Sequence, residues 1–167
     1  GARATRSRGT DSLSRKLDYK VWRYRQAYVV SAGNSGPGAG TIGKPACAKN
    51  ALTVGNVLDY GYQTIGDIRN SSSRGPTGDG RMKPNLVATG THIMSAEAGT
   101  SNSYRSMSGT SMAAPHITGL AATLMDHYSA FRYRPYLLRA HLMATAILHD
   151  DDTRPANNSR GGRNTYG

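Results

Sequence analysis

Two polar side chains in this sequence occupy positions where chemistry is expected. Ser111 follows Gly109 and stands just before an apolar run, 117–125, that is long enough to form a buried helix. At a helix N-terminus, unpaired backbone N–H groups and the positive end of the helix dipole favour developing negative charge, as acyl transfer to a serine requires. Asn34 directly follows a second apolar run, 27–32. Taken singly, a helix N-cap explains the serine equally well, and a turn explains the asparagine.

The elements that would position these residues follow from the hydrophobic pattern. The run 27–32 is apolar without alternation and is stopped by Gly33, which predicts a parallel strand covered on both faces. Asn34 then lies beyond the carboxyl end of a strand, where ligands bind in open α/β sheets. The same reasoning along the chain predicts helices over 12–26, about 111–128 and 135–147, strands over 27–32, 51–58, 85–88 and 92–96, and loops over 59–84.

Side-chain size and spacing predict which helix faces are buried. The first helix is expected to carry Arg and Lys on one face and to bury the other, with Leu13, Leu17, Val21 and Trp22. The last helix is expected to bury Leu138, Leu142 and Ala146. The helix after Ser111 is rich in small residues, which predicts close packing without a solvated face; these residues are Ala113, Ala114, Gly119, Ala121 and Ala122.

Composition limits the class of protein. The 167 residues suffice for about one domain, and 21 basic against 10 acidic side chains give a net charge of +11. Basic residues crowd the first 25 positions, but a solvated charged face explains such a cluster better than a nucleic-acid arm, so no nucleic-acid partner is expected. Cys47 is the single cysteine, which excludes an intrachain disulfide. No run approaches 18 apolar residues, so no membrane span is predicted. The composition does not indicate the oligomeric state.

Residues 108–119, S-G-T-S-M-A-A-P-H-I-T-G, resemble the nucleophile segment of the subtilisin-like serine peptidases, the subtilases. The family pattern there is G-T-S-M-A-x-P-H-x-x-G. Residues 31–36 are similar to the family segment A-A-G-N-x-G. The resemblance extends over about 12–146, with further matches at 45–55, 70–84 and 135–146.

The resemblance implies a fold, a reaction and a set of site residues. The fold is a three-layer α/β subtilisin-like fold with a mostly parallel sheet, here a partial domain over 12–149 between a loop or disordered start, 1–11, and a polar, Gly-rich tail, 150–167. The reaction is cleavage of peptide or protein substrates through an acyl-enzyme on Ser111. The resemblance places the Asn34 side chain and the Ser111 backbone N–H in the oxyanion hole. It assigns substrate binding and positioning of the nucleophile to Ser31, Ala32, Gly33 and Thr110.

Part of the expected machinery is missing from this sequence. A serine nucleophile needs a general base and an orienting carboxylate. Subtilases carry their triad in the chain order Asp, His, Ser, with both the Asp and the His upstream of the asparagine segment. The 33 residues before Asn34 contain no histidine, and Asp11 and Asp18 do not stand in a D-x-G setting. His116 comes five positions after Ser111 and does not share its helix face well, so a packing role is expected. The chain is therefore expected to be a piece of a longer precursor and, alone, inactive.

Two departures from the family pattern concern stability. The usual P-D-L-V-A-P-G reads P-N-L-V-A-T-G at 84–90, with Asn85 for Asp and Thr89 for Pro. Neither is expected to touch the nucleophile, so the effect should fall on stability or calcium affinity. The resemblance allows calcium, but no ligand set is complete, and we assign no metal ligand or cofactor. It also implies a secreted or extracytoplasmic location, although residues 1–25 contain no signal-peptide core.

Three alternatives compete with this interpretation. Residues 38–44 satisfy the G-x-x-x-x-G-K part of a phosphate-binding loop, but Pro45 stands where a Ser or Thr should bind magnesium. Asp126 and His149 follow Ser111 in the order of an α/β-hydrolase, but the second glycine of G-x-S-x-G is absent. The third alternative is a catalytically inactive truncated subtilase fold, or a basic binding module that uses the Arg-rich amino end on anionic partners.

Overall fold

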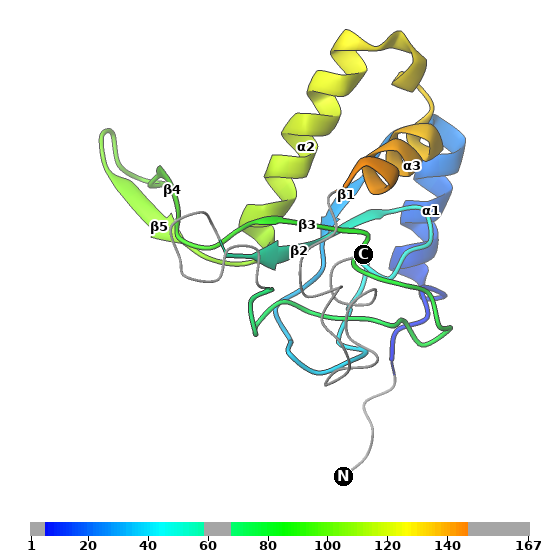
Figure 1. The fold of residues 1–167 in the computed structure, drawn as a ribbon, viewed down its shortest axis with the longest axis horizontal. Helices are drawn as coiled ribbons and strands as arrows, with labels where there is room; N and C mark the ends of the chain where they lie inside the picture. The colour runs from blue at the N-terminus through cyan, green and yellow to red at the C-terminus, as the bar shows by residue number, and fades with distance from the viewer. Residues whose placement is uncertain (1–5, 59–67, 147–167) are drawn as a thin grey trace.

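The structure is a computed structural model that describes residues 6–58 and 68–146. Figure 1 shows its helices and strands. In chain order they are α1 (Ser12–Tyr24), β1 (Val29–Ser31), β2 (Leu52–Val57), β3 (Leu86–Thr89), β4 (Ile93–Ala96), β5 (Tyr104–Met107), α2 (Thr110–His127), a short 3₁₀ helix (Ser129–Phe131) and α3 (Pro135–Thr145).

A parallel sheet with the order β1-β2-β3 forms the middle layer. Its central strand, β2, is buried along its whole length, and Val54 pairs with Ser31 of β1 and with Leu86 of β3. The sequence predicted a buried strand over 51–58, which contains β2.

Helices cover both faces of this sheet. On one face, α2 and α3 pack against Val54 and its neighbours through Ala113, Ile117, Ala121, Leu138 and Leu142. On the other face, α1 contributes Leu17 and Val21 to a separate cluster with Ala48 and Ala51. The adjacent side chains Val29 and Val30 pack into opposite clusters, as period-two alternation requires. This arrangement confirms the predicted three-layer α/β fold (Figure 1).

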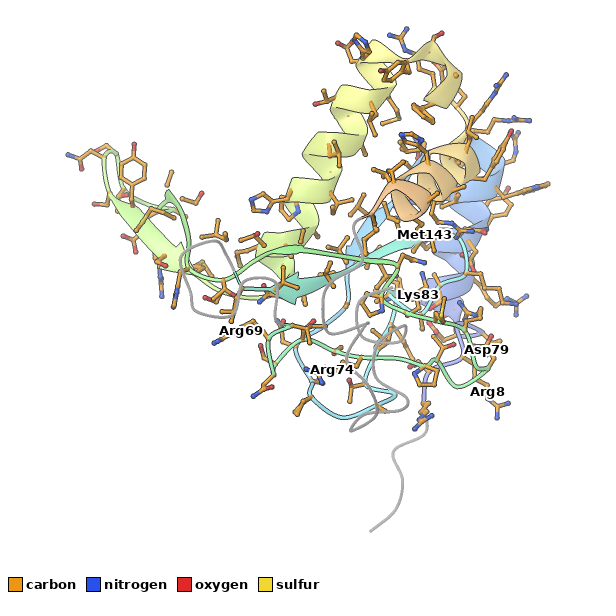
Figure 2. All side chains as sticks on the ribbon, viewed as in Figure 1. Arg8, Arg69, Arg74, Asp79, Lys83 and Met143 are labelled. Atoms are coloured by element: carbon orange, nitrogen blue, oxygen red, sulfur yellow. The ribbon has the colours of Figure 1, made fainter. Side chains whose placement is uncertain are left out.

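Lys83 ties β2 to the start of β3 from inside the protein (Figure 2). Its side chain is buried, and Nζ donates to the Ala51 carbonyl at 2.7 Å, to Thr53 Oγ1 at 2.8 Å and to Asn85 Oδ1 at 2.7 Å. Asn85 Oδ1 also accepts the Thr53 backbone N–H at 2.9 Å. Asn85, the departure noted in the sequence, therefore provides a neutral acceptor to a buried lysine.

The predicted buried face of α1 is wrong at two positions. Leu13 is 52% exposed and Trp22 is 72% exposed. Trp22 follows Val21 directly, and one residue turns an α-helix by about 100°, so its side chain leaves the buried face. In the first turn of α1 the small Ser14 is buried instead of Leu13, with its Oγ 3.4 Å from Cys47 Sγ.

The prediction that α2 lacks a solvated face is also wrong. The stripe of Ala113, Ile117 and Ala121 is buried against the sheet, whereas Leu120 is 47% exposed. A Cβ added at Gly119 would meet no atom within 4 Å, so this glycine serves no close packing in the described part of the chain.

The remaining sequence expectations differ in detail. Ala146 is exposed because α3 ends one residue earlier, at Thr145. The described part of the predicted loop region, 68–84, forms no helix or strand, as expected. Strand β5 was not predicted; it pairs antiparallel with β4 and forms a hairpin that projects beyond the start of α2 (Figure 1). The proposed tail, 150–167, and the first residues of the proposed start lie outside the described residues.

Candidate active site

The Asn34 side chain lies against the first residue of α2. Its Oδ1 accepts two hydrogen bonds from Thr110, from the backbone N–H at 3.0 Å and from Oγ1 at 3.1 Å. Thr110 Oγ1 in turn accepts the Gly33 backbone N–H at 3.2 Å. Because Oδ1 is held at this end, the amide nitrogen of the same group is directed away from Thr110. The end of β1 and the start of α2, 76 residues apart in the chain, thus meet at a carboxamide.

The turn between β3 and β4 fixes where α2 begins. The Gly109 N–H donates to the Gly90 carbonyl at 2.7 Å, and Ser108 Oγ accepts the His92 N–H at 2.9 Å. A Cβ at Gly90 would lie 2.6 Å from the Gly109 oxygen and 2.9 Å from the Ala113 Cβ, so this position requires glycine. Gly90 ends the family pattern quoted at 84–90, but the resemblance gave neither Gly90 nor Ser108 a role, because their importance depends on contacts between distant segments.

Ser111 is the second residue of α2 and is exposed. In the described part of the chain, its hydroxyl has no hydrogen-bonding partner. The first N–H groups of a helix have no acceptor one turn back. The Thr110 N–H is bound by Asn34, and those of Met112 and Ala113 by the Gly109 carbonyl, so the Ser111 N–H is the group of this turn left for a ligand.

A groove of about 570 Å³ lies beside Ser111, between α2 and the β4–β5 hairpin. Met94 and Met107 line it from the hairpin, with side chains 64% and 48% exposed, and Met112 and His116 line it from the helix. The sequence did not lead us to expect the hairpin that forms this side of the groove. The signal available was weak, a Gly-containing turn between two short segments.

The segment 31–33 leads from β1 to Asn34. Ala32 is buried, and its N–H donates to the Val54 carbonyl at 2.8 Å. Gly33 has φ of 104°, and its carbonyl accepts the Ser73 N–H at 2.9 Å. The predicted substrate-binding residues Ser31, Ala32 and Gly33 are therefore contiguous with Asn34, although they do not line the groove beside Ser111.

Three of the described histidines, His116, His127 and His141, have contacts other than Ser111, and the backbone N–H of a fourth, His92, donates to Ser108 Oγ. His116 Nδ1 forms a hydrogen bond with the Met112 carbonyl at 3.0 Å, so it is held to its own helix. The rings of His127 and His141 pack against Tyr128 and Phe131. His149 lies outside the described residues.

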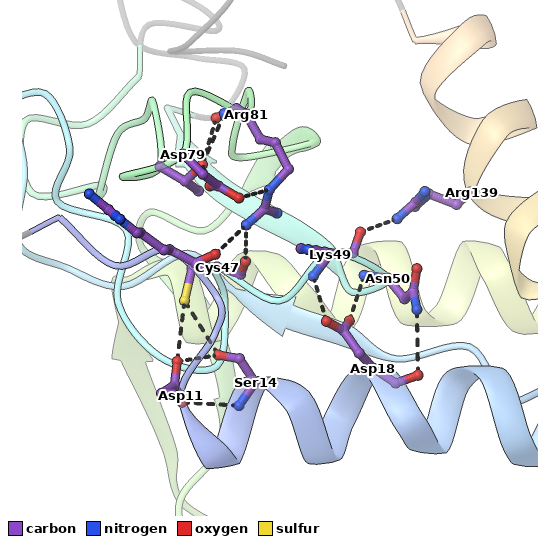
Figure 3. Close-up of polar contacts among 11 residues, drawn as sticks. Asp11, Ser14, Asp18, Cys47, Lys49, Asn50, Asp79, Arg81 and Arg139 are labelled. Carbon is purple, nitrogen blue, oxygen red and sulfur yellow. Dashed lines mark hydrogen bonds and ion pairs between the residues drawn. The ribbon is translucent and has the colours of Figure 1, made fainter.

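Both aspartates upstream of Asn34 have structural partners (Figure 3). Asp11 caps α1 by accepting the Ser14 N–H at 3.0 Å. Asp18 accepts the backbone N–H groups of Lys49 at 3.1 Å and Asn50 at 2.7 Å. Both belong to α1, on the face of the sheet opposite α2, so neither orients a base beside Ser111.

The described residues, 6–58 and 68–146, provide neither a metal cluster nor a membrane-spanning helix. These residues contain no group of three His, Cys, Asp or Glu side chains that could hold a metal ion, so calcium ligands stay unassigned. Among the same residues, no helix combines the length and apolar content needed to cross a membrane.

The fold and the site define an α/β protein in which a strand end presents an asparagine to the first turn of a serine-bearing helix. Residues 3–167 match the family model described as the subtilase family, so the chain belongs to this family of serine proteases.

Known proteins agree with this assignment. The chain is 35% identical to pyrolysin of Pyrococcus furiosus, over 86% of this chain and 12% of that protein. It is 35% identical to the serine protease AprX of Bacillus subtilis, over 70% of this chain and 29% of that protein. Among solved structures, S41 psychrophilic protease has a TM-score of 0.70 and 28% identity, over 86% of this chain and 47% of that one. Sphericase has a TM-score of 0.68 and 26% identity, with 87% and 46% covered. The chain thus spans less than half of these two structures.

Proposed function

We propose that the whole protein is a serine endopeptidase that cleaves peptide bonds through an acyl-enzyme on Ser111. The observation that carries this proposal is the pair of hydrogen bonds from Thr110 to Asn34, which brings the asparagine and serine motifs to one place. Peptide or protein substrates follow from the family. A secreted or extracytoplasmic location, which the family resemblance also implies, stays a prediction.

The proposal assigns two steps to this chain: attack of Ser111 on the scissile carbonyl, and stabilisation of the negative charge that forms on the carbonyl oxygen. The Ser111 oxygen bonds to the scissile carbonyl carbon while its proton passes to a base, and the carbonyl oxygen becomes an oxyanion. The Asn34 amide and the Ser111 N–H donate to this oxyanion. When the intermediate collapses, the C–N bond breaks and the base returns the proton to the leaving amine. Water then hydrolyses the ester and restores the serine.

The base and its carboxylate belong outside the described residues. The Ser111 hydroxyl has no partner in the described part of the chain, and Asp11 and Asp18 serve α1. Without a base, the oxyanion hole and binding leave a residual acceleration of about 10³–10⁴ over water. The 167-residue chain alone is therefore expected to show little turnover.

A fluorophosphonate probe on the full-length protein tests the assignment. Labelling should occur on Ser111 and disappear in Ser111→Ala, whereas Ser106→Ala, at an exposed serine of β5, should label normally. Asn34→Ala should reduce kcat about 10²–10³-fold, as found for the equivalent change in a subtilisin. Full activity in Ser111→Ala would remove the basis of the proposal.

The charge of the chain favours one second candidate, a non-enzymatic binding module for anionic partners. The net charge is +11, and α1 carries the exposed cations Arg15, Lys16 and Arg23. This candidate predicts that the full-length protein binds heparin with an affinity that falls steeply with salt, and that Ser111 is not labelled.

A further inference from the structure

A second concave site lies where the end of α1 meets the start of α3, away from the first turn of α2 (Figure 1). Its volume is about 250 Å³. Trp22 lines it from α1, Tyr133 from the loop before α3, and Tyr136 from α3. The proposed peptidase function does not use any of these residues.

The aromatic lining of this pocket is unusually exposed. Trp22 is 72% exposed, Tyr133 74% and Tyr136 63%. Large aromatic side chains usually bury their rings, and they are enriched where a binding surface presents an apolar face with a polar edge. Three such rings around one hollow provide faces on which a planar ligand can stack.

Two arginines complete the pocket, and no acidic residue lines it. Arg139 is held in place because its Nη1 donates to the Lys49 carbonyl at 2.5 Å (Figure 3). That contact uses one of the five N–H groups of its guanidinium. The nearby Asp18 carboxylate already accepts two backbone N–H groups, so it is oriented to the loop and not to the pocket. The second arginine, Arg25, follows α1 directly.

The backbone around the pocket is strained at two points. Arg25 has φ of 53° and Tyr133 has φ of 58°, values that residues with large side chains rarely adopt. In the described part of the chain, three non-glycine residues have positive φ, and two of them line this pocket. Such conformations cluster at ligand sites, where the strain places a side chain that a relaxed backbone would direct elsewhere.

We propose that this pocket binds a free nucleoside phosphate. The base would stack on Trp22 and Tyr136, and the phosphate would accept hydrogen bonds from Arg25 and Arg139. A guanidinium matches phosphate oxygens in a bidentate geometry, and a dianionic phosphate suits two cations that have no carboxylate between them. The volume lies near the lower limit of small-molecule sites, which suits one base better than a polypeptide segment.

The chain contains its own reporter, because Trp22 is its only tryptophan. AMP is titrated into the full chain with excitation at the red edge of tryptophan absorption, where adenine does not absorb. Saturable quenching is expected. Tyr136→Leu removes a stacking face, and Arg25→Asn removes a cation with a residue that tolerates the left-handed conformation. Each should weaken AMP binding at least about fivefold.

Matched controls distinguish binding in the pocket from non-specific attraction of AMP to any cation or any exposed aromatic ring. Arg15→Ala removes the same charge from an exposed position of α1, and Tyr104→Leu removes an equally exposed ring from β5; both should leave AMP affinity unchanged. Adenosine, which lacks the phosphate, should bind more weakly than AMP.

Three results would overturn the proposal. They are the absence of saturable quenching up to about 10 mM AMP, an equal loss of affinity in Arg15→Ala and Arg25→Asn, and binding of a single-stranded oligonucleotide without binding of AMP.

Discussion

Lys83 offers the sharpest test of how this structure is stabilised, because it is a buried cation that contacts no carboxylate of the described residues. The pKa of Lys83 is lowered from 10.5 to about 7, chiefly by burial and also by the charges of Arg139 on α3 and Arg81. Asp18 on α1 and Cys47 raise it. The acceptor closest in sequence, Asn85, is neutral. Asn85→Asp would place a carboxylate at this contact while keeping both of its hydrogen-bond acceptor roles.

The sign of the effect follows from proton binding. Because the pKa of Lys83 is lower in the folded state, the unfolded chain binds more protons between about pH 7 and 10.5, so stability rises with pH across this window. The pKa change corresponds to about 5 kcal/mol over the whole window. Between pH 7 and 9 the free energy of unfolding should increase by about 2 kcal/mol. Below pH 7 this contribution is constant.

Urea unfolding of the chain at pH 7, 8 and 9 measures this dependence. In Asn85→Asp the new carboxylate raises the pKa of Lys83 above the window, so the increase should disappear. Lys83→Met should also abolish it. Asn102→Asp adds the same charge in the exposed loop between β4 and β5 and should retain it. If the free energy of unfolding of Asn85→Asp still rises between pH 7 and 9 as in the unaltered chain, Lys83 does not have the lowered pKa that the structure requires.

Three further substitutions test the fold and the site. Leu138→Ala removes a side chain that is 1% exposed and should lower the free energy of unfolding by about 2–5 kcal/mol in denaturant titrations. Asp11→Ala removes the cap of α1 and should cost about 1 kcal/mol at neutral pH. Burial raises the pKa of Asp11, but hydrogen bonds from Ser14 outweigh this and lower it overall, so the loss should vanish in acid, as unfolding at low pH would show. Thr110→Val removes the hydroxyl that holds Asn34. In the full-length protein this should lower kcat by a larger factor than it changes KM, as steady-state kinetics would reveal.

The sequence predicted the sheet well because its signal is strong and local. The run that forms β1 is apolar without alternation, and its residues Val29 and Val30 pack against helices on opposite faces of the sheet. Neither segment by itself predicts the contact between Asn34 and the start of α2. It was predicted from the family resemblance, since 76 residues separate Asn34 from Thr110 and no spacing rule joins them.

The errors fall where packing depends on distant contacts. Trp22 was expected to be buried because it is large and apolar, yet it lies one residue beyond the buried stripe and lines a pocket. Strand β5 was missed because all of its side chains are exposed, so no hydrophobic alternation marks it. In the sequence, Gly90 was only the last residue of the family pattern at 84–90. Its need for glycine appears only when Gly109 and Ala113 are seen to pack against it.

The contacts around Asn34 divide the proposed reaction between this chain and the rest of the protein. Thr110 is fully buried, and its hydroxyl links Gly33 to Asn34, so residues of this chain orient the side chain proposed to stabilise the oxyanion. Proton transfer needs a base from elsewhere, because the Ser111 hydroxyl has no partner in the described part of the chain. Under the proposed function, the described residues therefore hold the oxyanion donors in position, and the base comes from elsewhere in the protein. Loss of the base and loss of Asn34 should then reduce turnover by separate mechanisms, and removing Asn34 should still leave Ser111 open to a phosphonylating probe, only more slowly.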